Sequence, residues 1–398
     1  MFGYRVNYTQ VVALIIATAV LVLIIGAMRN STLSLHAVVG SMVWATLGPH
    51  LVLLSLVACV FAFVGFYHFR GKLGSTALVL SIAALIGSTY ITTRIVTAAF
   101  NAGGSANPLH GLFLKSMDSG GPDEYVTFKT INNQVLNAAI YKPLQPSQPA
   151  PTLVYIHGGG FLTGSNTETD ADLRWFAEQG WLVFSVDYRL FSPGKPTWDK
   201  APQDVACAMA WVGANAYSFG GNPELIALLG DSAGGNLALN VAYAAALDAE
   251  LSDCGVVPVP KAVVVQYPAV DPLSIYEFGY PVPGFEPKML VAGYIGGSPY
   301  DFPARVSAVS SSTYISSKAP STLILAPKKD SIVPFSSVYG FAEEARLAGV
   351  SVEIVAIPFA NHVYNQLASG SIGNQARLSI TQRYLLENGL WPEVVQAE

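Results

Sequence analysis

A serine between two glycines is the first feature of this sequence that suggests chemistry. Residues 230–234 read Gly-Asp-Ser-Ala-Gly, so that a glycine stands two positions before and two positions after Ser232. An apolar run at 225–229 precedes them, and a segment of small residues with helical character follows at 236–247. This pattern is typical of a nucleophile elbow, in which a strained turn between a strand and a helix exposes a serine. Ser232 is therefore the candidate nucleophile, and the N–H of Ala233 is expected to face a developing oxyanion.

A serine hydroxyl needs a base to remove its proton, and elimination leaves one histidine for this task. Of the six histidines in the chain, five lie in or beside apolar runs, near the end of such a run, or in a glycine-rich loop: His36, His50, His68, His110 and His157. His362 lies instead on a polar loop after the last predicted strand, and it completes the chain order serine, aspartate, histidine. His362 is therefore the candidate general base.

Two aspartates compete for the role of the catalytic acid. Asp330 follows a predicted strand at 322–326, whereas Asp271 follows the preceding strand and stands beside Pro272. The acid must hold the imidazole in one tautomer and stabilise its charged form. We favour Asp330, because Asp271 is better explained as a structural residue. A helix N-cap is the alternative role for Asp330.

A glycine-rich loop supplies the remaining part of a serine hydrolase site. A predicted buried strand ends in His157-Gly158-Gly159-Gly160. Consecutive glycines allow backbone N–H groups to converge on one anionic oxygen, because no side chain blocks them. We therefore predict an oxyanion hole formed by Gly158, Gly159 and Gly160 together with Ala233, and a loop-orienting role for His157.

Together these motifs resemble the hormone-sensitive-lipase-like family of α/β-hydrolases, which includes the bacterial family IV esterases. The resemblance covers roughly residues 122–390 and rests on His157-Gly158-Gly159-Gly160, Asp187-Tyr188-Arg189-Leu190, Gly230-Asp231-Ser232-Ala233-Gly234-Gly235-Asn236, Tyr267-Pro268-x-x-Asp271, and the pair Asp330 and His362. It implies a Ser-Asp-His triad at these positions and hydrolysis of carboxylic esters, often with short to medium acyl chains. The family usually continues Asp-Tyr-Arg-Leu with Ala-Pro-Glu, whereas Phe-Ser-Pro-Gly follows here at 191–194. This departure concerns the local helix and salt bridges and not the triad.

We therefore predict a serine carboxylesterase or lipase that works through an acyl-enzyme and needs no metal or organic cofactor. Acyl transfer or deacetylation on a lipid or glycan, and amide cleavage, stay open because the same groups perform them. The multi-span amino terminus also resembles the plan of prenylcysteine methylesterases, which makes such an enzyme an alternative; it is a minor one, because those enzymes carry a different residue at the position of Asp231. An inactive hydrolase scaffold that serves adhesion is disfavoured, because no triad candidate is missing.

Strands and helices alternate through the larger part of the chain and place the candidate residues at strand ends. Buried strands are predicted at 152–156, 181–186, 225–229, 262–266, 322–326 and 352–357, after a hairpin at Asn132-Asn133. Helices are predicted at 170–179, 202–215, 335–348 and 380–388. This alternation predicts an α/β-hydrolase fold at 122–398, with a mostly parallel sheet and helices on both faces. An aromatic- and proline-rich segment around 272–307 is expected to add cap elements that line the acyl pocket.

The first hundred residues are far more apolar than the rest. The whole chain is 52% hydrophobic and only 12% charged, and three uncharged or weakly charged runs lie at 11–28, 51–69 and 73–96. Each run is long enough to cross the hydrocarbon core of a membrane. We predict an all-α transmembrane domain at 1–100 with about three spans and a linker at 101–121; a cleaved signal peptide and buried core helices are the alternatives. Residues 36–50 are expected to lengthen the second span or to lie along the interface.

The positive residues give an orientation in the membrane. With the amino terminus inside, the cytoplasmic residues are Arg5, Arg70 and Lys72, and the outer ones are Arg29, Arg94 and Lys115. This predicts a multi-pass integral membrane protein with an extracytoplasmic catalytic domain. The expected partners are an ester or lipid substrate and the membrane lipids. The net charge of −5 does not indicate binding to nucleic acid.

The three cysteines, Cys59, Cys207 and Cys254, have no metal-binding spacing and form no disulfide framework. Cys207 and Cys254 could pair, but two buried free thiols are the favoured interpretation.

Overall fold

The computed structural model describes residues 8–29, 34–144, 149–249, 252–282 and 284–392, and the chain divides into two compact units. The first, which we name the helical unit, comprises Met1–Lys115, Pro327–Lys329 and Ile357–Ser379. The second, the sheet unit, comprises Ser116–Ala326, Asp330–Ala356 and Ile380–Glu398. The helical unit is thus not confined to the amino terminus, because two segments from late in the chain belong to it.

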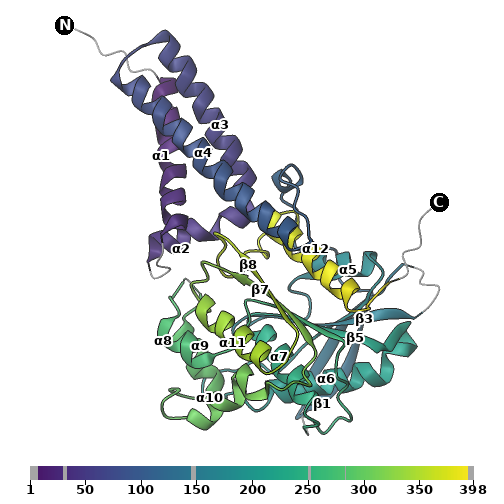
Figure 1. The fold of residues 1–398 in the computed structure, drawn as a ribbon. Coiled ribbons are helices and arrows are strands. Elements are labelled where there is room, and N and C mark those ends of the chain that lie inside the picture. The colour runs from purple at the N-terminus through teal and green to yellow at the C-terminus, as the bar shows by residue number, and fades with distance from the viewer. Residues whose placement is uncertain (1–7, 30–33, 145–148, 250–251, 283, 393–398) are drawn as a thin grey trace. The chain divides into compact units, whose positions relative to one another are not determined.

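The amino-terminal part of the helical unit contains the helices α1 (Tyr8–Met28), α2 (Leu35–Met42), α3 (Trp44–His68) and α4 (Lys72–Asn101). The three predicted apolar runs are helical; residues 44–50 form the start of α3 and lengthen the second run, whereas residues 36–42 lie in the separate helix α2. Helices α1, α3 and α4 pack against one another (Figure 1). Each of the three is long and apolar enough to cross a membrane. Arg5, one of the residues used for the orientation, lies outside the described residues.

Small side chains fill the interior of this bundle. The buried positions of α1, α3 and α4 are mainly alanine, serine and glycine, among them Ala13, Ala17, Ser55, Ala58, Ala62, Ala77, Ser81, Ala84 and Ser88. Large apolar side chains point outward, as Ile15 (63% exposed), Phe63 (62%) and Ile86 (66%) do. A water-soluble bundle would bury its large apolar side chains. Small residues between helices and large ones outside are the pattern of helices that lipid surrounds.

A mostly parallel sheet forms the core of the sheet unit. Its strands are β1 (Glu124–Ile131), β2 (Gln134–Tyr141), β3 (Ala150–Ile156), β4 (Leu182–Val186), β5 (Gly221–Asp231), β6 (Ala262–Gln266), β7 (Ser321–Pro327) and β8 (Val352–Ile357). They are arranged in the order β1-β2-β4-β3-β5-β6-β7-β8. The antiparallel hairpin β1–β2 turns at Asn132 and Asn133, whose φ angles of 47° and 65° suit asparagine. Strands β3, β4 and β6 are buried along their whole length, which explains their continuous apolar sequence.

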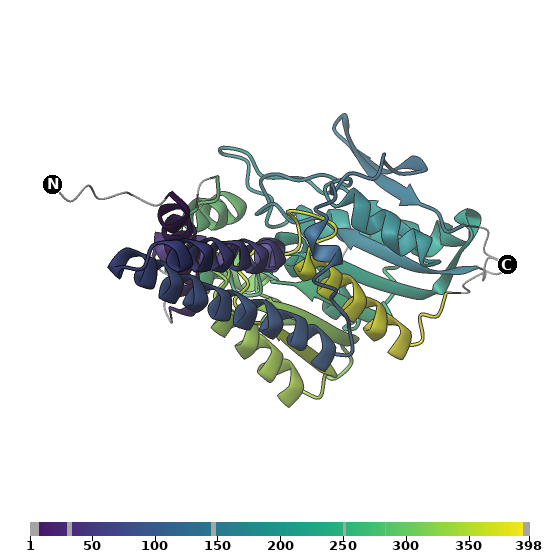
Figure 2. The same ribbon diagram turned by 90° about the horizontal axis from the view of Figure 1, so that it is seen from above.

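Helices lie on both faces of this sheet (Figures 1 and 2). The four helices α5 (Asp170–Glu178), α6 (Ala201–Asn215), α7 (Ala233–Ala245) and α11 (Phe335–Leu347) lie close to their predicted positions. The closing helix α12 (Ile372–Glu387) begins earlier than the predicted residue 380. Three short helices occupy the predicted cap region: α8 (Pro272–Phe278), α9 (Pro287–Ile295) and α10 (Pro303–Val309).

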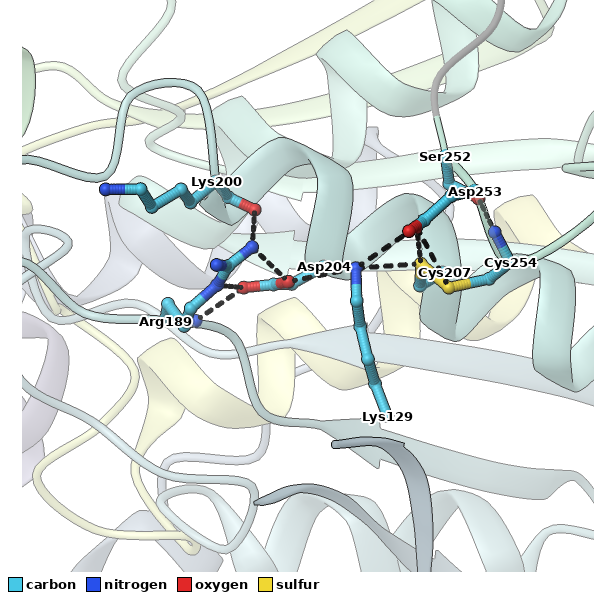
Figure 3. A network of polar contacts seen from close by, with 8 residues as sticks. All are labelled: Lys129, Arg189, Lys200, Asp204, Cys207, Ser252, Asp253 and Cys254. Atoms are coloured by element: carbon cyan, nitrogen blue, oxygen red, sulfur yellow. Dashed lines mark hydrogen bonds and ion pairs between the residues drawn. A yellow bond between two sulfur atoms is a disulfide. The ribbon is translucent and has the colours of Figure 1, made fainter. Parts of the chain in front are cut away.

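A disulfide between Cys207 and Cys254 links α6 to the segment that precedes β6 (Figure 3). The interpretation of two buried free thiols was therefore wrong: Cys207 is buried, Cys254 is exposed, and the sequence separation of 47 residues gave no sign of the pairing. Lys129 lies beside it, with its Nζ atom 3.0 Å from the Sγ atom of Cys207 and 3.5 Å from Oδ1 of the buried Asp204. Asp204 in turn accepts hydrogen bonds from both Nε and Nη2 of Arg189, at 2.6 and 2.8 Å. The salt bridge of the Asp-Tyr-Arg-Leu motif thus forms despite the departure that follows it in sequence.

Candidate active site

Ser232 occupies a strained turn at the junction of β5 and α7. Its φ of 54° and ψ of −114° belong to a region that non-glycine residues rarely adopt. The surrounding backbone holds this conformation: the Ser232 N–H donates to the carbonyl of Gln266 at 2.9 Å, and the Ser232 carbonyl accepts from the N–H of Ala269 at 3.1 Å. A strained, over-determined serine between strand and helix is the geometry of a nucleophile elbow.

The two flanking glycines of the elbow have no room for side chains. A Cβ atom on Gly230 would collide with the backbone of Gly234, and one on Gly234 would collide with the carbonyl oxygens of Ile156 and His157. Helix α7 therefore approaches the end of β3 as closely as backbone atoms allow. This is the physical reason for the spacing of glycines around Ser232.

The glycine loop lies directly beside the elbow. A Cβ atom on Gly158 would lie 3.1 Å from the carbonyl oxygen of Asp231 and 3.5 Å from Cβ of Ser232. Gly159 and Gly160 have φ angles of 100° and 62°, which glycine adopts without strain. Ala233 is the first residue of α7, so its N–H group has no partner within the helix ladder. The sheet unit thus places Gly158 against the elbow, with Gly159 and Gly160 next to it in the chain and Ala233 next to Ser232.

His157 supports this loop from within the protein. Its ring is buried and stacks on the ring of Tyr188, with centroids 4.4 Å apart, and its Nδ1 atom lies 2.8 Å from the carbonyl oxygen of Gly158. Burial lowers the pKa of His157 to about 4, so the imidazole is neutral at neutral pH. The hydroxyl of Tyr188 donates to the carbonyls of His157 and Gly158, at 3.0 and 3.1 Å. These contacts agree with a loop-orienting role for His157.

Sequence reasoning missed a set of acidic and phenolic groups behind the elbow. The hydroxyl of Tyr155 donates to Oδ2 of the buried Asp231 at 3.2 Å. Burial and then the charge of Asp231 raise the pKa of Glu168. Tyr155 lies in a continuous apolar strand that is buried along its whole length, and such a sequence does not distinguish a tyrosine with a polar partner from one that only packs.

The two aspartate candidates differ in what their carboxylates do. Asp271 is the N-cap of α8, where its Oδ1 atom accepts from the N–H of Ser274 at 3.2 Å. Asp330 is buried after β7, and its Oδ1 atom accepts from the N–H groups of Ile332 and Val333 at 2.9 and 2.8 Å. Asp271 thus has the structural role expected for it. Asp330 does not cap α11, because the N-cap of that helix is Pro334.

His362 lies on the loop that follows β8 and is 6% exposed. Its backbone N–H donates to Oδ1 of Asn361 at 2.7 Å. This loop belongs to the helical unit, whereas Ser232 and Asp330 belong to the sheet unit. Strands β5, β6, β7 and β8 are neighbours in the sheet, and Ser232, Asp330 and His362 follow β5, β7 and β8 along the chain.

The predicted cap segment packs on the glycine loop. A Cβ atom on Gly160 would lie 2.8 Å from the side chain of Leu290, which is on α9. The ring of Phe161 stacks on that of Tyr294, also on α9, with centroids 3.7 Å apart. The cap is tied to the elbow as well, since Nδ2 of Asn236 donates to the carbonyls of Ala269 and Val309. Leu290 is thus a cap side chain that packs on the glycine loop.

Among the described residues, the one cluster of side chains with metal-ligand geometry is Cys207, Asp253 and Cys254. Both sulfur atoms are committed to the disulfide, so the cluster offers no thiolate to a metal ion.

Comparison with known proteins connects this arrangement to esterases. The family model described as BD-FAE matches residues 138–344, which is just over half of the chain. The probable carboxylic ester hydrolase LipM of Mycobacterium tuberculosis is 28% identical over 245 residues, 57% of this chain and 52% of that protein. Hormone-sensitive lipase of Mus musculus is 34% identical over 128 residues, 32% of this chain and 16% of the lipase.

Solved structures show the same fold. Thermogutta terrifontis esterase 2, phosphonylated by sarin, superposes with a TM-score of 0.57 and 25% identity over 69% of this chain and 98% of the esterase. Its butyrate-bound form gives a TM-score of 0.55 and 25% identity over 70% and 97% of the two chains. The match thus confirms an α/β-hydrolase fold of the esterase type. The chain spans about half the length of the curated relatives it matches.

Proposed function

The chain belongs to the BD-FAE family, and from this premise we propose that it is a membrane-anchored serine hydrolase of carboxylic esters. One observation carries the proposal: Ser232 stands in a strained elbow beside a loop of glycines, a geometry that has a cost in backbone energy and serves acyl chemistry. The names of the relatives, which include a carboxylic ester hydrolase and a lipase, support the same reaction class.

In the proposed mechanism Ser232, His362 and Asp330 act as a triad. The Oγ atom of Ser232 attacks the ester carbonyl while His362 takes its proton, and the oxygen that becomes negative receives N–H donors from Gly159, Gly160 and Ala233. Collapse of this intermediate breaks the bond to the alcohol, which leaves with the proton from His362. Water then adds to the acyl-enzyme through the same groups and releases the acid. Asp330 holds the imidazole in the required tautomer.

Gly158 supports the oxyanion hole in another way. Its contact with the elbow leaves no space for a side chain, so glycine here lets the loop approach Ser232. No step of the proposed reaction requires a metal or an organic cofactor.

The substrate is proposed to be an ester with a short- to medium-length acyl chain or one derived from lipid. Leu290 and the stacked pair Phe161 and Tyr294 supply apolar surface beside the glycine loop, which suits an acyl group. The related esterase of Thermogutta terrifontis has been described with butyrate bound, which favours the shorter range.

We propose that α1, α3 and α4 cross the membrane and that the catalytic domain lies at 122–398 with a linker at 101–121. If each of these helices crosses once, two crossings (α3 and α4) separate α2 from the segment after α4. These two segments therefore lie on the same side of the membrane. Both make hydrogen bonds to late segments of the chain: Asn361 Nδ2 donates to Ser41 Oγ, and the Ser105 N–H donates to Ser379 Oγ. The disulfide supports the extracytoplasmic side for this domain, because disulfides persist in oxidising compartments.

The test is hydrolysis of p-nitrophenyl esters, from acetyl to palmitoyl, by the full-length protein in detergent. Wild type is expected to turn over the shorter esters and to be labelled by a fluorophosphonate. The Ser232→Ala variant should lose both properties, whereas Ser218→Ala, which changes a serine that bonds only a local carbonyl, should retain them. Full activity in Ser232→Ala would refute the mechanism. Addition of an alcohol as acceptor separates hydrolysis from acyl transfer by the product formed.

A further inference from the structure

The loop that carries His362 has a strained backbone. Phe359 and Val363, which stand on either side of His362, have φ angles of 56° and 54°, and neither is glycine. Such conformations persist only where the surroundings hold them in place. The neighbour of His362 in sequence, Asn361, contributes directly, because its Oδ1 atom accepts the N–H of His362 at 2.7 Å. The orientation of the Asn361 amide therefore affects the backbone position of His362.

The Asn361 amide is itself held by the amino-terminal helices. Its Nδ2 atom donates to Oγ of Ser41 at 2.8 Å, across 320 positions of sequence. Ser41 and Asn361 are each 2% exposed, so water cannot replace either partner. The hydroxyl of Ser41 donates its single proton to the carbonyl of Ala37 at 2.8 Å, which leaves its lone pairs directed to the amide. The chain of bonds thus runs from α2 through Asn361 to the backbone of His362.

Helix α2 is fixed by its contact with α1. A Cβ atom on Gly40 of α2 would lie 2.6 Å from Cα of Gly26 of α1, so the two backbones are in direct contact. The Nε2 atom of His36 is 2.8 Å from the carbonyl oxygen of Val22 on α1. The place of Ser41 is therefore set by one of the helices proposed to cross the membrane.

Lys329, which precedes Asp330 in the chain, also contacts the amino-terminal part of the helical unit. The Nζ atom of Lys329 donates to the carbonyl of Arg29, directly after α1, at 2.7 Å. The backbone N–H of Lys329 donates to the carbonyl of Ala360 at 3.0 Å, which joins the two loops. Tyr90 of α4 adds an edge-to-face contact with Phe359, with ring centroids 6.0 Å apart. Three separate contacts from the bundle thus reach the loop of His362, two directly and one through Lys329.

We propose that Ser41, acting through Asn361, is a positioning residue for His362, and that the contact of Lys329 with Arg29 supports the same loop through the bond of Lys329 to Ala360. The amino-terminal bundle is then part of the catalytic machinery and not an anchor alone. This inference rests on the proposed function, because it assumes that His362 is the base.

The test compares kcat and KM for p-nitrophenyl butyrate in the full-length protein, for wild type, Ser41→Ala and Ser41→Thr. Loss of the acceptor in Ser41→Ala should lower kcat about tenfold and leave KM unchanged, because the base is displaced while the pocket is intact. Threonine keeps the hydroxyl and should restore most of the rate. The rate of fluorophosphonate labelling should fall in parallel with kcat.

The matched control is Ser55→Ala. Ser55 is also a buried serine of the bundle, its hydroxyl donates to the carbonyl four residues earlier at 2.7 Å, and it accepts from Ser88 of another helix. Both of these hydrogen bonds lie within α3 and α4, so the Ser55→Ala variant should share any general loss of stability but keep wild-type kcat. An equal kcat in Ser41→Ala and Ser55→Ala would overturn the inference.

Two further results keep the test decisive. If Ser41→Ala does not fold, the Lys329→Met variant takes its place, because Lys329 is partly exposed. This variant must show a lower kcat, and an unchanged kcat contradicts the proposal.

A double variant tests whether Ser41 acts through Asn361. In the Asn361→Ala background, Ser41→Ala should have no additional effect on kcat. If wild type itself is inactive towards all esters and probes, the proposed function fails; if wild type is active and only the Ser41 and Lys329 effects are absent, this inference alone fails.

Discussion

The helical unit and the sheet unit bury opposite kinds of side chain. In the sheet unit the strands bury valine, leucine, isoleucine and phenylalanine, as at Val154, Phe184 and Leu228. In the helical unit alanine and serine are buried, and the large apolar side chains face outward. Burial from water explains the first arrangement. The second follows if the surrounding medium is itself apolar, because large side chains then gain nothing by turning inward.

The largest expected effect concerns two loops of the sheet unit, the one that carries Asp330 and the one that carries Asp271. Asp330→Asn should lower kcat by about 10³- to 10⁴-fold, because the amide favours the wrong tautomer of the base. Asp271→Asn should leave kcat within about twofold of wild type, because asparagine is as good an N-cap as aspartate. Steady-state kinetics on both variants decides the assignment. The reverse order of effects would make Asp271 the acid.

The next largest effect is expected from the covalent link in the sheet unit. Replacing Cys207 and Cys254 by alanine should reduce the free energy of unfolding of this unit by about 4 kcal/mol, the loop-closure value for a 47-residue separation. Chemical denaturation followed by a tryptophan signal measures the change. The Cys59→Ala variant is the control, since Cys59 is the free cysteine and lies in the helical unit. An equal loss in the control would mean that the disulfide does not stabilise the sheet unit.

An arginine introduced at an exposed apolar position should affect the helical unit and the sheet unit differently. Ile86→Arg places a cation in the middle of α4 at a position that is 66% exposed, and should cost about 3 kcal/mol of insertion free energy. Leu347→Arg, at an 89% exposed position of α11, should cost almost nothing because water already surrounds it. The yield of each variant in carbonate-washed membranes is the measurement. Equal yields would contradict the lipid-facing assignment of α4.

The smallest expected effect is a pH dependence in the sheet unit. Burial lowers the pKa of His157 from 6.5 to about 4, so between these values the unfolded chain binds a proton that the folded one does not. Stability should therefore fall as pH falls from 6.5 to about 4, by about 2 to 3 kcal/mol. The variant His157→Phe, which keeps a ring to stack on Tyr188, should flatten this part of the profile. An unchanged slope would mean that other groups dominate the titration in this range.

The sequence was sufficient for the parts of the fold that depend on local patterns. The buried strands were recognisable because burial on both faces leaves a continuous apolar run. The elbow and the glycine loop were recognisable because close backbone approach excludes side chains at Gly230 and Gly158. The structural role of Asp271 was recognisable from the adjacent Pro272, which suits the first turn of a helix.

The parts that could not be predicted depend on distant partners. The pairing of Ser41 with Asn361 spans 320 positions and that of Lys329 with Arg29 spans 300, and neither has a local signature. The disulfide between Cys207 and Cys254 likewise joins residues far apart in sequence and has no local signature. The early start of α12 was hidden because Gly373 and Asn374 are poor helix formers, and packing of Ile372 overrides their propensity.

The discontinuous make-up of the helical unit has a consequence for biosynthesis. Its helices leave the ribosome first, whereas the segments Pro327–Lys329 and Ile357–Ser379 are made near the end of translation. The strained loop around His362 can acquire its supports only when these late segments meet helices that are already in place. If His362 is the base, as proposed above, a nascent chain gains hydrolytic activity only after its helices are in place.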